Sequence, residues 1–435
     1  MNRPNINFHS ASRHFTFANI RQYSIIQSHF LHKMAATFPV AIDPSMPSSN
    51  GRVKRPREFT CFSYDKDHKF RLDDSSLKWY YPPQGPFLDA GMDLSRGFET
   101  FDKHDDSVDE HLDSLLKTIA HFEQQTQEPI DANIVTWRGM MTKIMAAPFD
   151  DEGFEMNATL YRGCVFIEEN HAFKLKRNAE QSSRPQQHQQ QRKGPPPEVM
   201  SFWGYKFETL CTLPRPWGEV SRDYIESRDS LVVSNKDQYC SVVRTGVDDS
   251  ILCLGGEVDC LWGTRPSPPD EKGAPINWVE LKTTAEFRGK QDELWFKNKK
   301  MMKFWIQSYL LGVPKIVFGF RDRNGILKRI EEMETMQLPR IARNARCQWS
   351  ADGCINFMSS FLAWLRVTVN DDGVWRIRRQ KGASEIEVWR VEEAGHGEVL
   401  TEEFMNWRIK LDLIMEGKKK STEEGGTLEQ AAKGS

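Results

Sequence analysis

Two short segments that alternate charged and apolar residues constrain this 435-residue chain more than any other feature of its sequence. The first, Gly256–Asp259, reads Gly-Glu-Val-Asp, and the second, Trp278–Lys282, reads Trp-Val-Glu-Leu-Lys. Side chains on a strand alternate between its two faces, so the two acids of the first segment share one face, as do Glu280 and Lys282 of the second. If the two strands pair, three carboxylates and a lysine meet on one surface while the aliphatic residues enter the core.

The charge pattern indicates a metal-dependent hydrolase. Three carboxylates at close range repel one another, and a hard divalent cation relieves this repulsion because Mg²⁺ or Mn²⁺ prefers oxygen ligands. Such a cation polarises a phosphoryl oxygen and supplies an activated water, while a nearby lysine orients that water or offsets charge in the transition state. The pattern is typical of nucleases with an Asp…Glu-x-Lys core. Either of the two charged segments alone usually consists of exposed charges without a catalytic role. Their combination on two apolar strands favours a catalytic site.

Further candidates for the site lie on other predicted elements. Glu208 belongs to the predicted helix Ser201–Cys211, where spacing fits a solvated side chain as well as a fourth acid in the site. Arg138 follows the predicted strand Ile134–Trp137, and it could grip a phosphate bidentately or pair with a surface carboxylate.

The predicted helix Gln291–Leu311 carries a polar stripe formed by Lys300, Lys303 and Gln307. A basic stripe with an amide suits contacts to a phosphodiester backbone. A solvated helix face is the commoner explanation of such lysines, so the spacing leaves both interpretations open.

Composition narrows the class of protein. The formal charge of −2 gives no overall basic field, so nucleic-acid binding must come from a local patch. The eight cysteines are scattered without a Cys-x-x-Cys pair, which argues against a structural zinc site or a disulfide framework and for a reducing compartment. Because no run approaches the roughly 18 apolar residues of a membrane span, no membrane association is expected.

The chain divides into three predicted parts. Residues 1–55 are expected to form a disordered or targeting-like tail, residues 56–415 a single catalytic domain, and residues 416–435 a disordered charged tail. The Gln-rich segment 178–197 is expected to be a low-complexity insertion within the domain.

Strands and helices are mixed within the predicted domain. Hydrophobic periodicity predicts a helix over Asp105–Gln124 and strands over the following segments: Thr159–Ile167, Ile251–Trp262, Asn277–Thr283 and Lys315–Phe320. Because they do not alternate as strict βαβ units, we expect one α/β domain of the mixed α+β type around a mixed sheet.

Several motifs in order along the chain resemble the eukaryotic DXO/Rai-type decapping nuclease family, and a fungal Rai-like member in particular. The resemblance covers about Pro56 to Phe320 and rests on seven motifs: Phe62-Ser63-Tyr64-Asp65, Tyr80-Tyr81-Pro82-Pro83, Trp137-Arg138-Gly139, Gly204-Tyr205-Lys206-Phe207-Glu208, Gly256-Glu257-Val258-Asp259, Glu280-Leu281-Lys282, and Gln307 before Gly312-Val313-Pro314. It implies a fold of two β-sheets flanked by helices, the larger sheet mixed, with an Asp…Glu-x-Lys nuclease-like core.

The resemblance also implies a role for each matching residue. One or two divalent cations, Mg²⁺ or Mn²⁺, are implied, with ligands at Glu208, Asp259, Glu280 and the main-chain carbonyl of Leu281. Glu257 is implied to bind a second metal or a metal-bound water. Lys282 and Gln307 are implied to position the attacking water and the scissile phosphate, and Arg138 to contact the RNA 5′ end.

The activities that the resemblance implies concern RNA 5′ ends. They are release of pyrophosphate from 5′-triphosphate RNA, removal of unmethylated or NAD caps in mRNA quality control, and in some members 5′–3′ exonuclease activity. Two alternatives stay open: a DNA exonuclease with the same core, and a non-catalytic partner that stimulates a nuclear 5′–3′ exoribonuclease. We expect a nuclear location, with the cytoplasm as the alternative. The acid-free, basic stretch before Asp43 also suits mitochondrial targeting.

Overall fold

The computed structural model describes residues 35–41, 53–89, 91–182, 195–266 and 275–432, and its strands form two sheets. In that part of the chain the larger sheet has ten strands, in the order β1 (Ala36–Pro39), β17 (Glu385–Glu392), β16 (Val374–Arg379), β7 (Phe154–Tyr161), β8 (Cys164–Glu169), β6 (Ile134–Trp137), β11 (Ser250–Glu257), β10 (Gln238–Val247), β2 (Lys54–Tyr64) and β3 (Phe70–Arg71). The smaller sheet, counted over the same residues, has seven strands, in the order β5 (Met92–Asp93), β15 (Ile326–Glu334), β14 (Lys315–Arg321), β13 (Trp278–Ala285), β12 (Cys260–Leu261), β4 (Trp79–Tyr80) and β9 (Thr212–Leu213).

Both sheets combine parallel and antiparallel strands. In the larger sheet β6 runs parallel to β8 and β11, and in the smaller sheet β13 runs parallel to β14. The α-helices of the described residues are α2 (Pro86–Asp89), α3 (Asp113–Thr126), α4 (Arg138–Ala146), α5 (His171–Ser182), α7 (Pro197–Cys211), α8 (Arg222–Ser227), α9 (Lys290–Trp295), α10 (Met301–Leu311), α11 (Leu338–Asn344), α12 (Ala351–Thr368) and α13 (Glu402–Ala432). The predicted mixed fold with two sheets and surrounding helices is confirmed.

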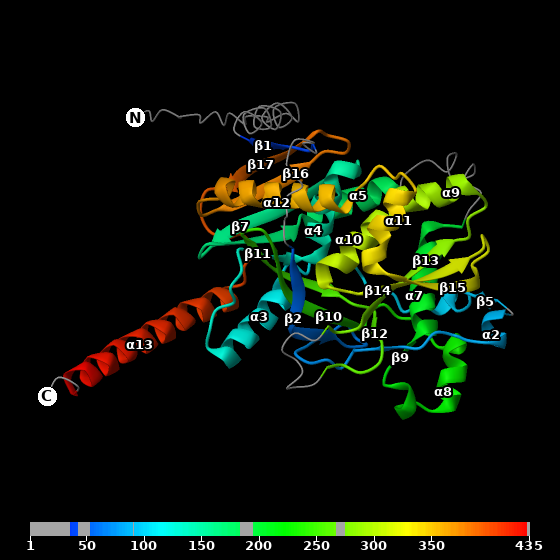
Figure 1. Ribbon diagram of the computed structural model, residues 1–435, viewed down its shortest axis with the longest axis horizontal. Coiled ribbons are helices and arrows are strands. Elements are labelled where there is room, and N and C mark those ends of the chain that lie inside the picture. Colours follow the sequence, from blue (N-terminus) through cyan, green and yellow to red (C-terminus); the bar gives the residue numbers. More distant parts are fainter. Residues whose placement is uncertain (1–34, 42–52, 90, 183–194, 267–274, 433–435) are drawn as a thin grey trace, which may run out of the picture.

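Helices pack on both faces of the larger sheet. On one face α3 and α13 share a core with Phe166 and Val242 of the sheet. On the other face α4, α10 and α12 form a second core; α4 and α10 lie near the middle of the molecule, and α12 lies above them in the view of Figure 1. This second core also includes Ile316 and Phe318 of β14, whereas α7 covers the opposite face of the smaller sheet. Helix α10 therefore packs against residues of both sheets.

The predicted N-terminal tail contains an ordered strand. β1 pairs with β17 at the edge of the larger sheet, and its Phe38 packs against Phe357 and Phe361 of α12. Pro39 is tolerated because an edge strand does not need every backbone donor. The prediction of a tail over 1–55 is therefore wrong at β1 and at Lys54, where β2 begins, while residues 1–34 of the targeting-like stretch lie outside the described residues.

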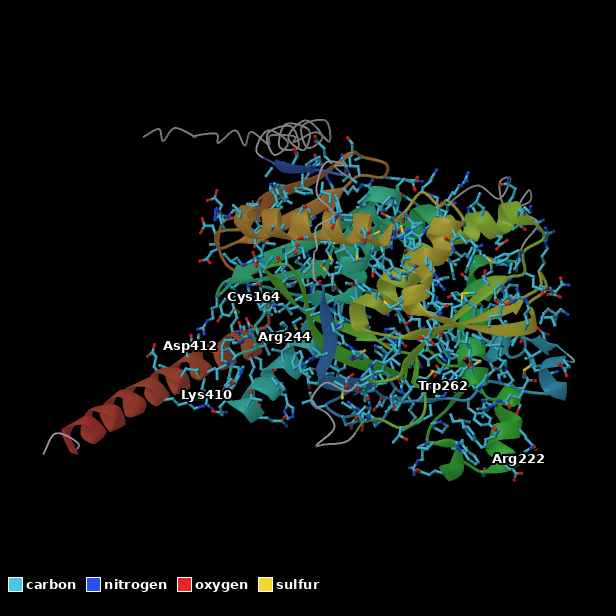
Figure 2. The ribbon with its side chains drawn as sticks, viewed as in Figure 1. Cys164, Arg222, Arg244, Trp262, Lys410 and Asp412 are labelled. Carbon is cyan, nitrogen blue, oxygen red and sulfur yellow. The ribbon has the colours of Figure 1, made fainter. Side chains whose placement is uncertain are left out.

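The prediction of a disordered tail over 416–435 is wrong as far as Ala432. Helix α13 continues to that residue and runs outward from the body (Figure 1). Buried Phe404 and Trp407 anchor its beginning. Figure 2 labels Asp412 on this helix, and Asp412 forms an ion pair with Arg162. Because Lys and Glu have high helix propensity, a helix that starts on docked residues continues through a charged segment.

The predicted strand Thr159–Ile167 is two strands in the structure. β7 and β8 form a hairpin, and its turn residues Arg162 and Gly163 both have positive φ values, 51° and 76°. A two-residue turn of this kind matches the twist of the flanking strands. The predicted helix Asp105–Gln124 begins later, at Asp113, and its apolar stripe is buried as expected.

The other predicted segments agree with the structure in part. The predicted helix Gln291–Leu311 is α9 and α10 joined by a π-helix, Phe296–Lys300. The predicted insertion 178–197 is wrong at its ends, since α5 extends to Ser182 and α7 begins at Pro197; residues 183–194 lie outside the described part. Among the helices that the structure describes, none has the length and apolar content needed to cross a bilayer.

Candidate active site

The acidic motifs meet where the chain passes from one sheet to the other. β11 ends at Glu257 in the larger sheet, and β12 begins at Cys260 in the smaller sheet, where it pairs with β13. The predicted single strand Ile251–Trp262 is therefore wrong, because its hydrogen-bond partners change from β10 to β13 at this crossing. Asp259 lies in the crossing, and its Oδ2 accepts a hydrogen bond from the main-chain N–H of Leu281 at 2.6 Å. This bond fixes the crossing against β13.

Two glycines before Glu257 allow close packing beside the site. A Cβ atom on Gly255 would lie 2.7 Å from the indole ring of Trp137. A Cβ atom on Gly256 would lie 3.0 Å from Cβ of Arg138, which begins α4 directly after β6. The absence of side chains at these two positions therefore lets Arg138 approach the acidic motifs.

Glu280 lies between two cations. Its Oε1 is 2.7 Å from Nζ of Lys282, and its Oε2 is 3.4 Å from Nη1 of Arg138. Its side chain is 1% exposed, so burial works to raise its pKa, but the charges of Lys282 and then Arg138 outweigh burial and leave the pKa below its ordinary value. The predicted alternation of β13 is confirmed, since Val279 and Leu281 enter the core on its other face.

For the other three acids burial outweighs the nearby cations, so that their pKa values are raised. Burial, followed by the charges of Asp259 and Glu257, raises the pKa of Glu208 well above its ordinary value. Burial and then Glu280 raise the pKa of Asp259 to about 7. Burial also raises the pKa of Glu257, against the opposing effect of Lys78 and Arg138. All three keep some contact with solvent. Oxygen donors that repel one another and remain accessible fit the ligand preference of a hard divalent cation.

Lys78 is a further charged residue of the site, and it was not predicted from the sequence. It lines a cavity of about 20 Å³ together with Glu208, Glu257 and Asp259. Its Nζ forms an ion pair at 2.8 Å with Asp237, which lines the same cavity. The signal in the sequence is its position two residues before the Tyr-Tyr-Pro-Pro motif, in an apolar stretch where a lysine needs a buried partner.

Of the predicted substrate-binding residues, Lys282 lies among the acids, whereas Arg138 and Gln307 lie beside them. Arg138 forms an ion pair with Glu280, not with a surface carboxylate. Gln307 lies on α10 and lines a separate cavity of about 190 Å³, together with Gly139 at the start of α4. Lys303 lines that cavity too, but its Nζ already pairs with Asp150 at 2.5 Å, so it is not a free phosphate contact.

The mixed sheet and the Asp259, Glu280 and Lys282 arrangement define a nuclease of the PD-(D/E)XK class. Comparison with known families gives the same class. Residues 54–405 match the family described as RAI1-like PD-(D/E)XK nuclease. The chain belongs to this family.

Relatives of this chain are similar over most of its length. It is 59% identical to the decapping nuclease RAI1 of Neurospora crassa over 383 residues, which cover 87% of this chain and 89% of the relative. It is also similar to the crystal structure of Candida albicans Rai1 in complex with pU5-Mn²⁺, with a TM-score of 0.78, 31% identity, and coverage of 87% of this chain and 100% of that one. Scheffersomyces stipitis Rai1 in complex with (3′-NADP)⁺ and a calcium ion has a TM-score of 0.76 and 28% identity, covering 86% and 100% of the two chains.

Proposed function

We propose that this chain is a divalent-cation-dependent decapping nuclease that hydrolyses RNA 5′ ends. The observation that carries the proposal is the convergence of Glu208, Glu257 and Asp259 beside Glu280, which is itself paired with Arg138 and Lys282. The substrates that we propose are 5′-triphosphate RNA, from which pyrophosphate is released, and RNA with unmethylated or NAD caps. The relatives described in complex with pU5-Mn²⁺ and with (3′-NADP)⁺ support a site for nucleotides and divalent cations.

The acids are proposed to hold Mg²⁺ or Mn²⁺. The proposed ligands of the first cation are Glu208, Asp259, Glu280 and the main-chain carbonyl of Leu281, and Glu257 is the proposed ligand of a second. When bound, such a cation polarises a phosphoryl oxygen and lowers the pKa of the attacking water. The hydrogen bond from the N–H of Leu281 to Asp259 holds one of these acids in place.

The proposed roles of the cationic and amide side chains follow from where they lie. Lys282 is within 2.7 Å of Glu280, so its ammonium offsets negative charge that develops on a phosphoryl group bound beside that acid. Arg138 presents a guanidinium at the N-terminus of α4, where a fork of donors suits a terminal phosphate. Gln307 borders the neighbouring cavity and is proposed to orient the scissile phosphate.

Incubation of the purified chain with four RNAs tests this proposal. The substrates are 5′-triphosphate, GpppN-capped, NAD-capped and 5′-monophosphate RNA, each with Mg²⁺, Mn²⁺ or EDTA. Metal-dependent release of pyrophosphate, cap dinucleotide or NAD supports the proposal, and shortening of the 5′-monophosphate RNA supports 5′–3′ exonuclease activity. A single-stranded DNA of the same sequence serves as the control for a DNA exonuclease. A folded protein inactive on every RNA would contradict the proposal.

We further propose a nuclear location and a nuclear 5′–3′ exoribonuclease as a protein partner. Imaging of the tagged full chain tests the location. A pull-down with the purified exoribonuclease tests the partner. Replacing Glu257 and Asp259 together by Ala is expected to abolish hydrolysis while retaining the partner, because these two residues face the acid cavity rather than the outer surface.

A further inference from the structure

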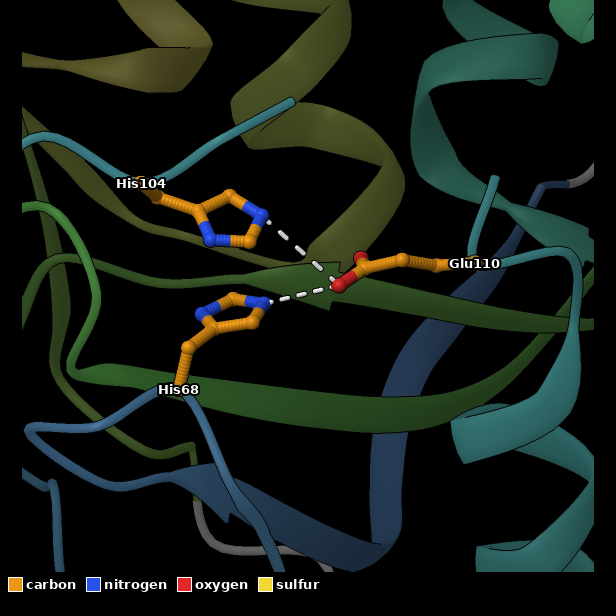
Figure 3. Close-up of side chains that lie close together, drawn as sticks. All are labelled: His68, His104 and Glu110. Carbon is orange, nitrogen blue, oxygen red and sulfur yellow. Dashed lines mark hydrogen bonds and ion pairs between the residues drawn. The ribbon is translucent and has the colours of Figure 1, made fainter. Parts of the chain in front are cut away.

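A cluster of two histidines and a glutamate lies outside the acidic site. His68 follows β2, and His104 and Glu110 belong to the segment that precedes α3. Figure 3 shows both imidazole rings directed toward the carboxylate of Glu110. Nε2 of His68 lies 2.9 Å from Oε1 of Glu110, and Nε2 of His104 lies 3.7 Å from the same oxygen. One possible ligand atom from each residue therefore lies within 4.8 Å of the others.

The backbone around His68 fixes which of its nitrogens faces the cluster. Nδ1 of His68 lies 2.9 Å from the main-chain oxygen of Lys236. A carbonyl oxygen can only accept, so Nδ1 carries a proton and Nε2 is the nitrogen available to a ligand. Histidines that bind metals usually donate their second N–H to a carbonyl or carboxylate in this way, which sets the tautomer and the ring orientation.

Both rings are held in position by their neighbours. Tyr64 stacks on the ring of His68, with ring centroids 4.1 Å apart, and the ring of His104 also stacks on that of His68, with centroids 3.7 Å apart. The main-chain N–H of His104 donates to Oδ1 of Asn235 at 2.7 Å. His68 also adopts a left-handed backbone conformation with φ of 57°, a strained arrangement for a residue with a Cβ atom. These contacts preorganise the rings before any ion binds.

We propose that His68, His104 and Glu110 bind a transition-metal ion of the Zn²⁺ type. Two imidazole nitrogens and one carboxylate oxygen suit Zn²⁺, which accepts three protein ligands and completes its tetrahedron with water. The all-oxygen donors of the acidic site suit Mg²⁺ or Mn²⁺ instead. Without an ion, Nε2 of His68 also carries a proton, which it donates to the carboxylate of Glu110, and ion binding releases this proton to solvent. The positions of the cysteines gave no sign of such a site, because its ligands are two histidines and a glutamate.

The ion would join two segments that are far apart in the sequence. The segment before α3 is already held at two other points. Asp102 forms an ion pair with Lys236, and the main-chain oxygen of Ser107 lies 2.8 Å from Nε2 of His171. The Lys236 backbone that holds His68 lies between Asn235 and Asp237, which line the acid cavity. A bound ion therefore stiffens one wall of that cavity. This inference does not depend on the proposed hydrolysis of RNA.

Titration of the metal-stripped full chain with Zn²⁺ in excess Mg²⁺ tests the proposal, with Co²⁺ absorption as a second readout of coordination. We expect one tight Zn²⁺ site and a tetrahedral Co²⁺ spectrum. His68→Ala with His104→Ala should weaken Zn²⁺ binding by about 100-fold or more. Two controls should keep the site: His121→Ala, outside the cluster on α3, and Glu257→Gln with Asp259→Asn in the acidic site. Zn²⁺ binding that survives the double histidine change, or that is lost in the acidic-site variant instead, would overturn the assignment.

Hydrogen exchange of the unaltered chain gives a test that needs no variant. With Zn²⁺ bound, amide exchange should slow by at least about 10-fold in the segment between Lys103 and His111, because opening it must first release the ion. The same Zn²⁺ addition should leave exchange unchanged in α8, which lies outside the cluster. Unchanged exchange between Lys103 and His111 at saturating Zn²⁺ would show that His68 and Glu110 form an ordinary ion pair.

Discussion

At the scale of single residues, tertiary contacts shift the pKa values of four chemically similar acids in different directions. Lys282 and Arg138 outweigh the effect of burial on Glu280 and hold its pKa low, whereas burial and mutual repulsion raise the pKa values of Glu208 and Asp259. The alternation of β13 predicted that Glu280 and Lys282 share a face. The partner of Arg138 could not be predicted, because it depends on where α4, which packs on the larger sheet, lies relative to β13 of the smaller sheet.

Replacing Glu280 by Ala should be at least as damaging as replacing Lys282 by Ala. Without Glu280, the guanidinium of Arg138 and the ammonium of Lys282 lose the carboxylate between them. We expect hydrolysis of 5′-triphosphate RNA to fall by about 100-fold or more. Urea unfolding should show a loss of about 3–5 kcal/mol, typical of breaking a buried ion pair. Glu286→Ala, an exposed acid just after β13, is the matched control. A fully active Glu280→Ala protein would exclude Glu280 as a metal ligand.

Replacing Gly256 by Ala should disturb the site without removing a charged group. The added Cβ would lie 2.9 Å from Cδ1 of Leu311 and 3.0 Å from Cβ of Arg138, so one of them must move. We expect a loss of about 1–3 kcal/mol in the free energy of unfolding, as for other overpacked cores, together with weaker hydrolysis. Gly289→Ala is the control, since its Cβ would meet nothing within 4 Å. Equal stability and activity in both variants would mean that the packing at Gly256 is loose.

At the scale of elements, periodicity located most helices and strands but not the points where the chain changes direction. The pattern over Ile251–Trp262 is continuous, yet the chain leaves one sheet and joins the other at Asp259, because only the assembled fold provides a second set of hydrogen-bond partners. Likewise, the segment after Met415 has no apolar stripe that predicts order. Its helix continues from residues of α13 that dock on α3.

The docking of α13 depends on a buried ion pair. Oε1 of Glu123 on α3 is 2.7 Å from Nη2 of Arg408, and its Oε2 accepts from Nε1 of Trp407 at 3.0 Å. Because Glu123 is fully buried, Arg408→Ala leaves an uncompensated charge, and the free energy of unfolding should fall by about 3–5 kcal/mol. Lys410→Ala, an exposed change on the same helix, should stay within about 0.5 kcal/mol of the unaltered chain in urea unfolding. Similar losses in both variants would argue against a special role of the pair.

At the scale of the whole molecule, the acidic site lies where the two sheets meet, so its electrostatics are linked to folding. Asp259 has a pKa of about 7 in the folded chain, against an ordinary value of 3.8. Between these pH values the folded state keeps a proton that the unfolded chain has released. The free energy of unfolding therefore falls as pH rises from 3.8 to about 7, by up to about 4 kcal/mol for this group.

A divalent cation should counteract this loss, because it replaces the proton as the positive charge among the acids. Saturating Mn²⁺ is therefore expected to raise the melting temperature more at about pH 8, where Asp259 must otherwise stand as a bare carboxylate, than at about pH 5, where the proton competes with the ion. Asp259→Asn should reduce both the pH dependence without metal and the gain from Mn²⁺, whereas Asp372→Asn, in an exposed turn before β16, should change neither. Equal stabilisation by Mn²⁺ at both pH values would mean that the cation binds away from these acids. A larger rise in melting temperature at the higher pH that is lost in Asp259→Asn would show that the cation binds at the charged form of Asp259. Cation binding at the junction of the two sheets would then be coupled to folding.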